Sequence, residues 1–67
     1  MYWNHRVVKK GDEFGIHEVY YENGRAYMCT DDSVPIVGDN LKELRQTLQW
    51  MKKALRKPIL NYEEIGE

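Results

Sequence analysis

The sequence predicts an α+β fold: a three-stranded antiparallel β-meander followed by one amphipathic helix packed on one face of the sheet. Three observations indicate this order. Aromatic and β-branched residues gather in three runs, residues 3–10, 14–22 and 25–30, as they do in strands. Short turn sequences that contain glycine separate these runs. Residues 41–57 then carry apolar side chains at alternating spacings of three and four, which is typical of a helix.

Two turns connect the expected strands. Residues 11–13 (Gly-Asp-Glu) join the first strand to the second. Asn23 and Gly24 join the second to the third, because a type I′ hairpin turn needs positive φ at both central positions. Residues 31–33 end the third strand, and Pro35 keeps the segment after it extended or on an edge.

The two-residue turn also fixes which side chains share a face of the hairpin. Counting back from the turn pairs Val19 with Met28 and Tyr20 with Tyr27. Side chains alternate along a strand, so these two pairs lie on opposite faces. We expect the apolar Val19–Met28 pair to lie in the core beneath the helix, and the Tyr20–Tyr27 face to be half exposed in a monomer.

The helix has clear signals at both ends. Asn40 is a favourable N-cap with Glu43 three residues later, an Asn variant of the capping box. Pro58 stops the helix and pushes Lys57 out of the α region. The tail, residues 58–67, could lie along the sheet or along the helix. Five apolar side chains form one stripe within about 80° of each other: Leu41, Leu44, Leu48, Met51 and Leu55.

Length and composition indicate one small domain over residues 1–67. A domain of this size has a marginal core and often relies on a disulfide, a metal or a partner chain. Cys29 is the only cysteine, which excludes an internal disulfide and favours a reducing compartment. His5, His17 and Cys29 lack the spacing of a metal site. With neither a signal peptide nor a membrane-spanning run in the sequence, we expect a cytoplasmic protein without metal or cofactor.

The sequence also predicts that the chain is not an enzyme. It contains no phosphate-binding loop, dinucleotide fingerprint or nucleophile elbow. The carboxylates and hydroxyl of residues 31–33 are explained by turn chemistry. His17 and Glu18 are neighbours on a strand, so they point to opposite faces and cannot form a catalytic dyad. A chain of 67 residues is also short for a fold that encloses a substrate pocket.

Two groups of aromatic residues are candidates for contact with another chain. Tyr20 and Tyr27 either stabilise each other across the strands or, with Ile16, form an exposed contact surface. Trp50 lies about 130° from the centre of the helix stripe, with Ala54 between. Either the tail covers Trp50, or Trp50 anchors a homodimer or partner contact. The candidate interface residues are therefore Tyr20, Tyr27, Ile16, Trp50 and Ala54.

The helix is strongly basic, with six Lys or Arg against one acid, Glu43. This basic face is either simply solvated or able to bind phosphates and other anions. The acidic tail could neutralise it from within the chain. The candidate anion-binding or nucleic-acid-binding residues are Lys42, Arg45, Lys52, Lys53 and Arg56, with Lys57 beside them.

Three segments resemble a group of short bacterial proteins of unknown function. Residues 15–21 (GIHEVYY), 38–44 (GDNLKEL) and 57–60 (KPIL) are similar to that group's G-I-x-E-V-Y-Y strand, G-[DE]-[ST] helix start and K-P-[IV]-L close. The resemblance implies a bacterial origin and brings no activity. The order of elements and residues 38–44 are also similar to HicB-type antitoxins. Here, however, Leu44 replaces the usual Ala, and only residues 59–60 are available for the strand expected after the helix.

Taken together, these features predict a non-catalytic protein-interaction module that self-associates. The expected partner is a second copy of the chain or another protein, and a membrane is not expected. The alternative is a nucleic-acid-binding or antitoxin-like regulator that uses the basic helix face.

Overall fold

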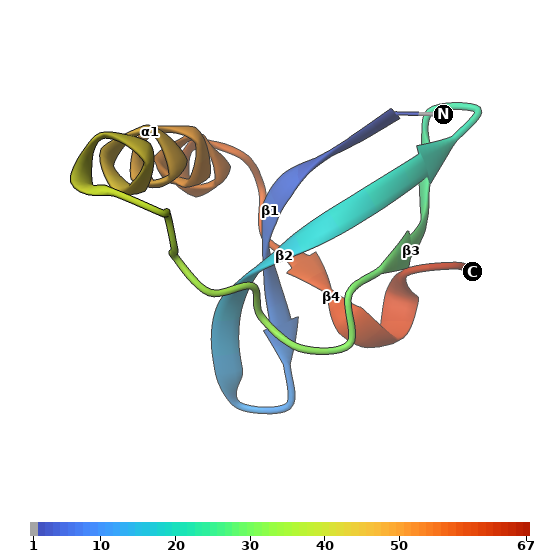
Figure 1. Ribbon diagram of the computed structural model, residues 1–67. Coiled ribbons are helices and arrows are strands. Elements are labelled where there is room, and N and C mark those ends of the chain that lie inside the picture. The colour runs from blue at the N-terminus through green and yellow to red at the C-terminus, as the bar shows by residue number, and fades with distance from the viewer. Residues whose placement is uncertain (1) are drawn as a thin grey trace.

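A computed structural model describes residues 2–67 of the chain, which form a curled sheet and a projecting helix (Figure 1). The sheet of these residues has four strands in the order β3-β2-β1-β4. The strands are β1 (Tyr2–Lys10), β2 (Glu13–Glu22), β3 (Arg25–Cys29) and β4 (Leu60–Asn61). The helices are α1 (Leu41–Lys52) and two 3-10 turns, η1 (Lys53–Arg56) and η2 (Tyr62–Glu64).

The α+β class and the three antiparallel strands are confirmed, with strand ends within one residue of the prediction. The fourth strand was not predicted. β4 pairs in parallel with β1, Leu60 opposite Val8 and Asn61 opposite Lys9. Two residues are too few to leave a recognisable alternation of polar and apolar side chains, so this pairing has no signal in the sequence.

The hairpin turn between β2 and β3 is as predicted. Asn23 has φ 54° and Gly24 has φ 80°, the positive values that a type I′ turn requires. The first two pairs after the turn are also those that a two-residue turn predicts. Glu22 lies opposite Arg25, and Tyr21 lies opposite Ala26.

Beyond these pairs the predicted register is wrong, because β3 contains a β-bulge. Tyr20 lies opposite Met28 rather than Tyr27, and Val19 lies opposite Cys29. The extra residue moves Met28 to the exposed face and brings Cys29 beside the buried Val19. The predicted Val19–Met28 core pair therefore does not form.

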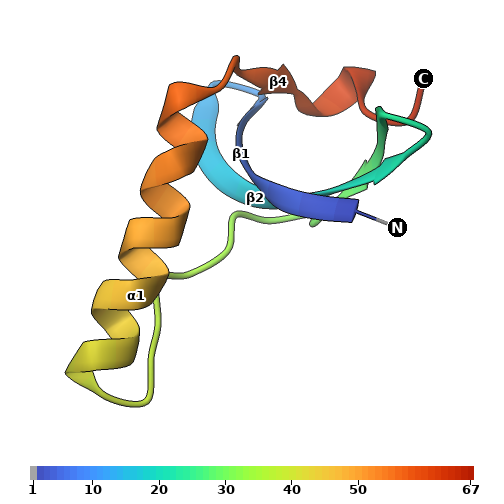
Figure 2. The same cartoon turned by 90° about the horizontal axis from the view of Figure 1, so that it is seen from above.

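The sheet curls, and the C-terminal segment closes it from the far side (Figure 2). The Gly66 N–H donates to the Ala26 carbonyl of β3 at 3.2 Å. The Tyr62 hydroxyl donates to Asp31 Oδ1 at 3.2 Å, and Lys10 donates to the Asp31 carbonyl at 2.7 Å. The tail thus lies along the sheet and returns to β3, rather than along the helix.

The core is small and centred on β1. Val7 and Val8 are both buried although neighbours on a strand point to opposite faces. β1 is therefore covered on both faces, and the helical turns that pack against it are η1 and η2. The other fully buried apolar residues are Val19, Met51 and Ala54.

The helix begins and ends as predicted. The Glu43 N–H donates to Asn40 Oδ1 at 2.9 Å, and the Asp39 N–H donates to the Glu43 carboxylate at 3.1 Å. Lys57 is extended (φ −105°, ψ 158°) before Pro58. The last turn, however, is 3-10 rather than α-helical.

The predicted position of the helix across one face of the sheet is wrong. α1 projects from the sheet, with its first turns beyond the strands (Figure 2). Its buried residues are Met51 and Ala54 at the C-terminal end. Viewed down the helix axis, the midpoint between Met51 and Ala54 lies about 70° from the centre of the predicted apolar stripe. The C-terminal tail covers part of the curled sheet. The helix therefore packs on the sheet only through its last turns.

Candidate functional site

The most unusual surface of the chain is an exposed line of leucines on the projecting helix. Leu41, Leu48 and Leu55 recur every seven residues, so they form one row, here called the leucine line. Their side chains are 59, 43 and 67% exposed. Ile36 and Val37, on the segment leading into the helix, are exposed as well. Most of the predicted core stripe is therefore open surface.

The chain as a whole exposes more surface than its size warrants. Its accessible surface is 5252 Å², and the mass is 8.0 kDa. A compact monomer of that mass exposes about 4450 Å², so the excess is about 800 Å². One partner in a standard protein interface buries about 800 Å². The radius of gyration, 12.3 Å, also exceeds the value of about 11 Å expected for this length.

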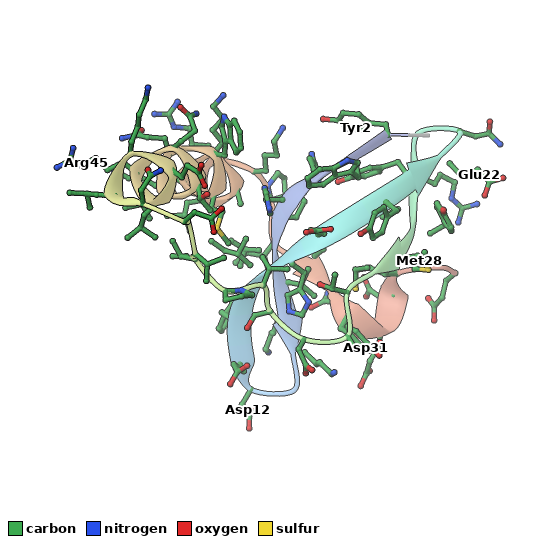
Figure 3. The ribbon with its side chains drawn as sticks, viewed as in Figure 1. Tyr2, Asp12, Glu22, Met28, Asp31 and Arg45 are labelled. Carbon is green, nitrogen blue, oxygen red and sulfur yellow. The ribbon has the colours of Figure 1, made fainter. Side chains whose placement is uncertain are left out.

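Basic residues border the leucine line. Arg45 and Lys52 lie three residues before and four residues after Leu48, so they are its neighbours on the helix surface. Both side chains are exposed. Figure 3 shows Arg45 at the helix, on the opposite side of the molecule from Met28 and Asp31. Any surface that covers the leucine line therefore also meets these two positive charges.

A second surface, here called the indole groove, lies between the start of β1 and the end of the helix. It has a volume of about 400 Å³. Trp50 is 54% exposed, and its neighbours across the groove come from β1. The lining residues are Tyr2, Trp3, Asn4, His5, Trp50, Lys53 and Lys57. The tail lies elsewhere, with Tyr62 bonded to Asp31, so the interpretation that the tail covers Trp50 is wrong.

The indole of Trp3 contacts two other rings on the sheet. Its ring packs edge-on against His5, with centroids 5.4 Å apart, and lies 6.5 Å from the ring of Tyr20. Trp3 and His5 share a face because they are two residues apart on one strand. These contacts fix one wall of the indole groove without help from the helix.

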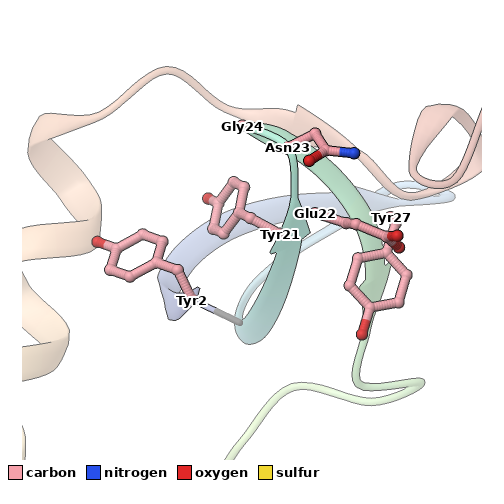
Figure 4. Close-up of a pocket in the computed structure, with 6 residues that line it drawn as sticks. All are labelled: Tyr2, Tyr21, Glu22, Asn23, Gly24 and Tyr27. Carbon is pink, nitrogen blue, oxygen red and sulfur yellow. The ribbon is translucent and has the colours of Figure 1, made fainter.

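The predicted tyrosine surface is not assembled as expected. Tyr20 is half-buried, and its hydroxyl donates to Glu18 at 2.7 Å, a hydrogen bond that raises the Tyr20 pKa above 10.0. Tyr27 is displaced by the bulge and lines a different recess, of about 620 Å³, near the hairpin end. There its ring points away from those of Tyr2 and Tyr21, which lie 5.4 Å apart (Figure 4).

The remaining predicted interface residues are less accessible than expected. Ile16 is half-buried, opposite Val7 in the sheet. Ala54 is completely buried within the chain, so it offers no surface to a partner. Of the predicted set, Trp50 is the residue that the structure leaves fully available.

The predicted basic residues are all exposed and lie within one arc of about 100° around the helix, but at different positions along its axis. Lys53 belongs to the indole groove, together with Lys57. Arg45 and Lys52 border the leucine line, and Lys42 lies at the first turn, far from the groove. The structure thus places two lysines among aromatic rings, an arrangement that the helix sequence alone did not predict.

Two titratable side chains of the sheet are withdrawn from solvent, those of the buried His17 and the half-buried Cys29. His17 is buried, with Nδ1 2.9 Å from the Thr30 carbonyl oxygen. Burial raises the pKa of the Cys29 thiol above 9.0, and the charge of Asp31 adds to that effect. Residues 2–67 contain no group of three or more His, Cys, Asp or Glu side chains that could hold a metal ion.

No protein-family model, curated protein or solved structure matches this chain. The resemblances to short bacterial proteins and to HicB-type antitoxins therefore stay predictions. Within residues 2–67, neither the length nor the apolar content of any helix is enough for it to cross a membrane. The features that bear on function are therefore the two exposed surfaces of the helix.

The sequence contains a pattern for each of the two surfaces, but each pattern also fits a different structure. A strict seven-residue repeat is the pattern of a helix–helix seam as well as of a core stripe. For the indole groove, Trp3 and His5 are two residues apart and share one strand face, and Lys53 follows Trp50 by three residues, a helical spacing. Lys57 has no such signal, because it is extended beyond the 3-10 turn. What the sequence lacked was any signal that these two faces meet.

Proposed function

We propose that this protein is a non-catalytic interaction module that self-associates, with the leucine line of one copy covering that of another. The main support is the leucine line itself, whose three side chains are 43–67% exposed in the single chain. The accessible surface, about 800 Å² larger than that of a compact monomer of this mass, agrees with an open helix face.

A second copy of this chain is the partner that the small core favours. Residues 2–67 bury five apolar side chains, and a core this small gains most from a partner that is present whenever the chain is present. The leucine line is also symmetric about its middle residue. Around a two-fold axis at Leu48, Leu41 of one copy faces Leu55 of the other, and both copies use the same surface.

The bordering charges give this arrangement a distinctive salt dependence. In a two-fold pair of helices, Arg45 of one copy approaches Lys52 of the other, and the same contact is repeated on the other side of the axis. Their repulsion weakens the pair at low ionic strength and is screened as salt rises. Self-association should therefore strengthen with salt, whereas binding of an acidic partner to the same surface would weaken.

The test is sedimentation velocity over a dilution series of the full chain, in 50 mM and 500 mM NaCl. We expect a dimer whose dissociation constant falls by about threefold or more at the higher salt. Leu48→Ser should shift the dissociation constant upward by about tenfold or more. It should leave the circular dichroism spectrum unchanged, because Leu48 is already 43% exposed.

The matched control is Phe14→Ser, which removes an exposed apolar residue of β2, outside the leucine line. It should leave the dimer intact. A wild-type chain that stays monomeric at 200 μM in both salts would overturn the proposal, and so would equal losses from the two substitutions.

A further inference from the structure

The indole groove is separate from the surface used in the proposed self-association. Trp50 lies about 160° around the helix from the leucine line. A second copy on that line would leave the groove open. The groove must then be explained by its own chemistry, which combines indole faces with the ammonium groups of Lys53 and Lys57.

The indoles supply flat apolar surfaces on two separate elements. Trp3 comes from β1, Trp50 comes from α1, and both side chains are about half exposed. Indole faces stack well on nucleobases, and this stacking is the usual source of affinity for unpaired bases. The groove volume of about 400 Å³ lies in the range of small-ligand sites.

The lysines supply positive charge on the helical side of the same groove. Lys53 follows Trp50 by three residues and is its neighbour on the helix surface, and Lys57, extended after the 3-10 turn, lines the same groove. The helix and its 3-10 extension hold five basic residues and one acid, and Lys57 follows directly, so the potential at this wall is positive. A phosphate group next to a stacked base would meet these ammonium groups.

We infer that the indole groove binds a nucleotide unit, with its base stacked on Trp3 or Trp50 and its phosphate held by Lys53 and Lys57. Single-stranded nucleic acid and free mononucleotides share this chemistry. An acidic peptide would satisfy the two lysines but would leave the indole faces without a flat partner. The combination of stacking surfaces and cations therefore favours a nucleotide.

The test uses three probes with the full chain in 50 mM NaCl. Fluorescein-labelled dT10 and rU10 are followed by anisotropy, and UMP is followed by quenching of tryptophan fluorescence. We expect saturable binding of at least one probe. Binding of an oligonucleotide alone would identify a single strand as the ligand, and comparable binding of UMP would identify a free nucleotide.

Substitutions then assign the binding to the groove. The double variant Lys53→Gln/Lys57→Gln and the single variant Trp50→Leu should each weaken the best probe by about tenfold. Lys42→Gln/Arg45→Gln is the matched control, since it removes two charges from the same helix outside the groove. The control should change affinity by less than about threefold.

Two outcomes would overturn the inference. One is the absence of saturable binding of all three probes at protein concentrations up to 1 mM. The other is an equal loss in the groove and control variants, which would indicate diffuse attraction to a basic helix. Leu48→Ser separates this inference from self-association, since it should weaken the dimer by about tenfold or more and leave nucleotide binding within about twofold.

Discussion

The sheet and the projecting helix of this molecule differ in how much of their surface the chain itself covers. The sheet is closed by hydrogen bonds from the C-terminal segment, including Gly66 to Ala26 and Tyr62 to Asp31. The helix buries Met51 and, just after α1 ends, Ala54, and leaves its leucine line open. The chain thus supplies much of the closure of its own sheet, whereas it leaves most of the apolar stripe of the helix exposed.

The largest expected effect tests how the helix is attached. Met51→Ala should lower the free energy of unfolding by about 2–5 kcal/mol, because Met51 is fully buried where α1 meets the sheet. Leu41→Ala, on the exposed line, should cost less than about 1 kcal/mol in dilute protein. Urea denaturation followed by circular dichroism measures both. Similar losses would mean that the leucine line is already buried in the isolated chain.

An intermediate effect is expected at the entrance to the helix. A Cβ atom at Gly38 would lie 2.5 Å from the backbone nitrogen of Leu44, too close for any side chain. Gly38→Ala should therefore destabilise the chain by about 1–3 kcal/mol. The melting temperature gives the measurement, and Val37→Ala serves as the neighbouring control. An unchanged melting temperature in Gly38→Ala would show that the loop and the helix start move independently of the rest of the fold.

The smallest effect concerns the closure of the sheet. The hydrogen bond to Asp31 is the main cause that raises the pKa of Tyr62 above its ordinary value of 10.0. The folded state thus favours the neutral phenol, so this contribution to stability is complete below pH 10 and lost as pH rises through the higher folded pKa. Absorbance at 295 nm should show a late-titrating tyrosine that is missing in Tyr62→Phe. A variant with the same titration curve would place the tail elsewhere.

The sequence was sufficient for features that depend on a few neighbouring residues. The Asn23-Gly24 turn, the Asn40 cap and the end of the helix before Pro58 all have local causes, and each lies where it was predicted. The antiparallel strands follow from the same kind of signal. Local backbone preferences are strong at these positions, so tertiary contacts do not override them.

The features that could not be predicted depend on contacts between distant segments. The bulge at Tyr27 and the two-residue strand at Leu60 have no local pattern, since both are decided by the curl of the sheet. The direction of the helix then follows from that curl. The leucine stripe was correctly identified as apolar and one-sided, but its exposure depends on where the sheet ends, which helical periodicity does not describe.

The short outer strands of the sheet limit the ways in which a partner can be recognised. The edges are β4, of two residues, and β3, of five, and the segment after β4 donates a hydrogen bond back to Ala26. Edges this short and partly occupied are poor templates for an added strand. A peptide that binds by extending a sheet would have to pair with the outer edge of β1 before Val8, because β4 covers only Val8 and Lys9. The two terminal strands themselves are too short to favour edge-to-edge aggregation.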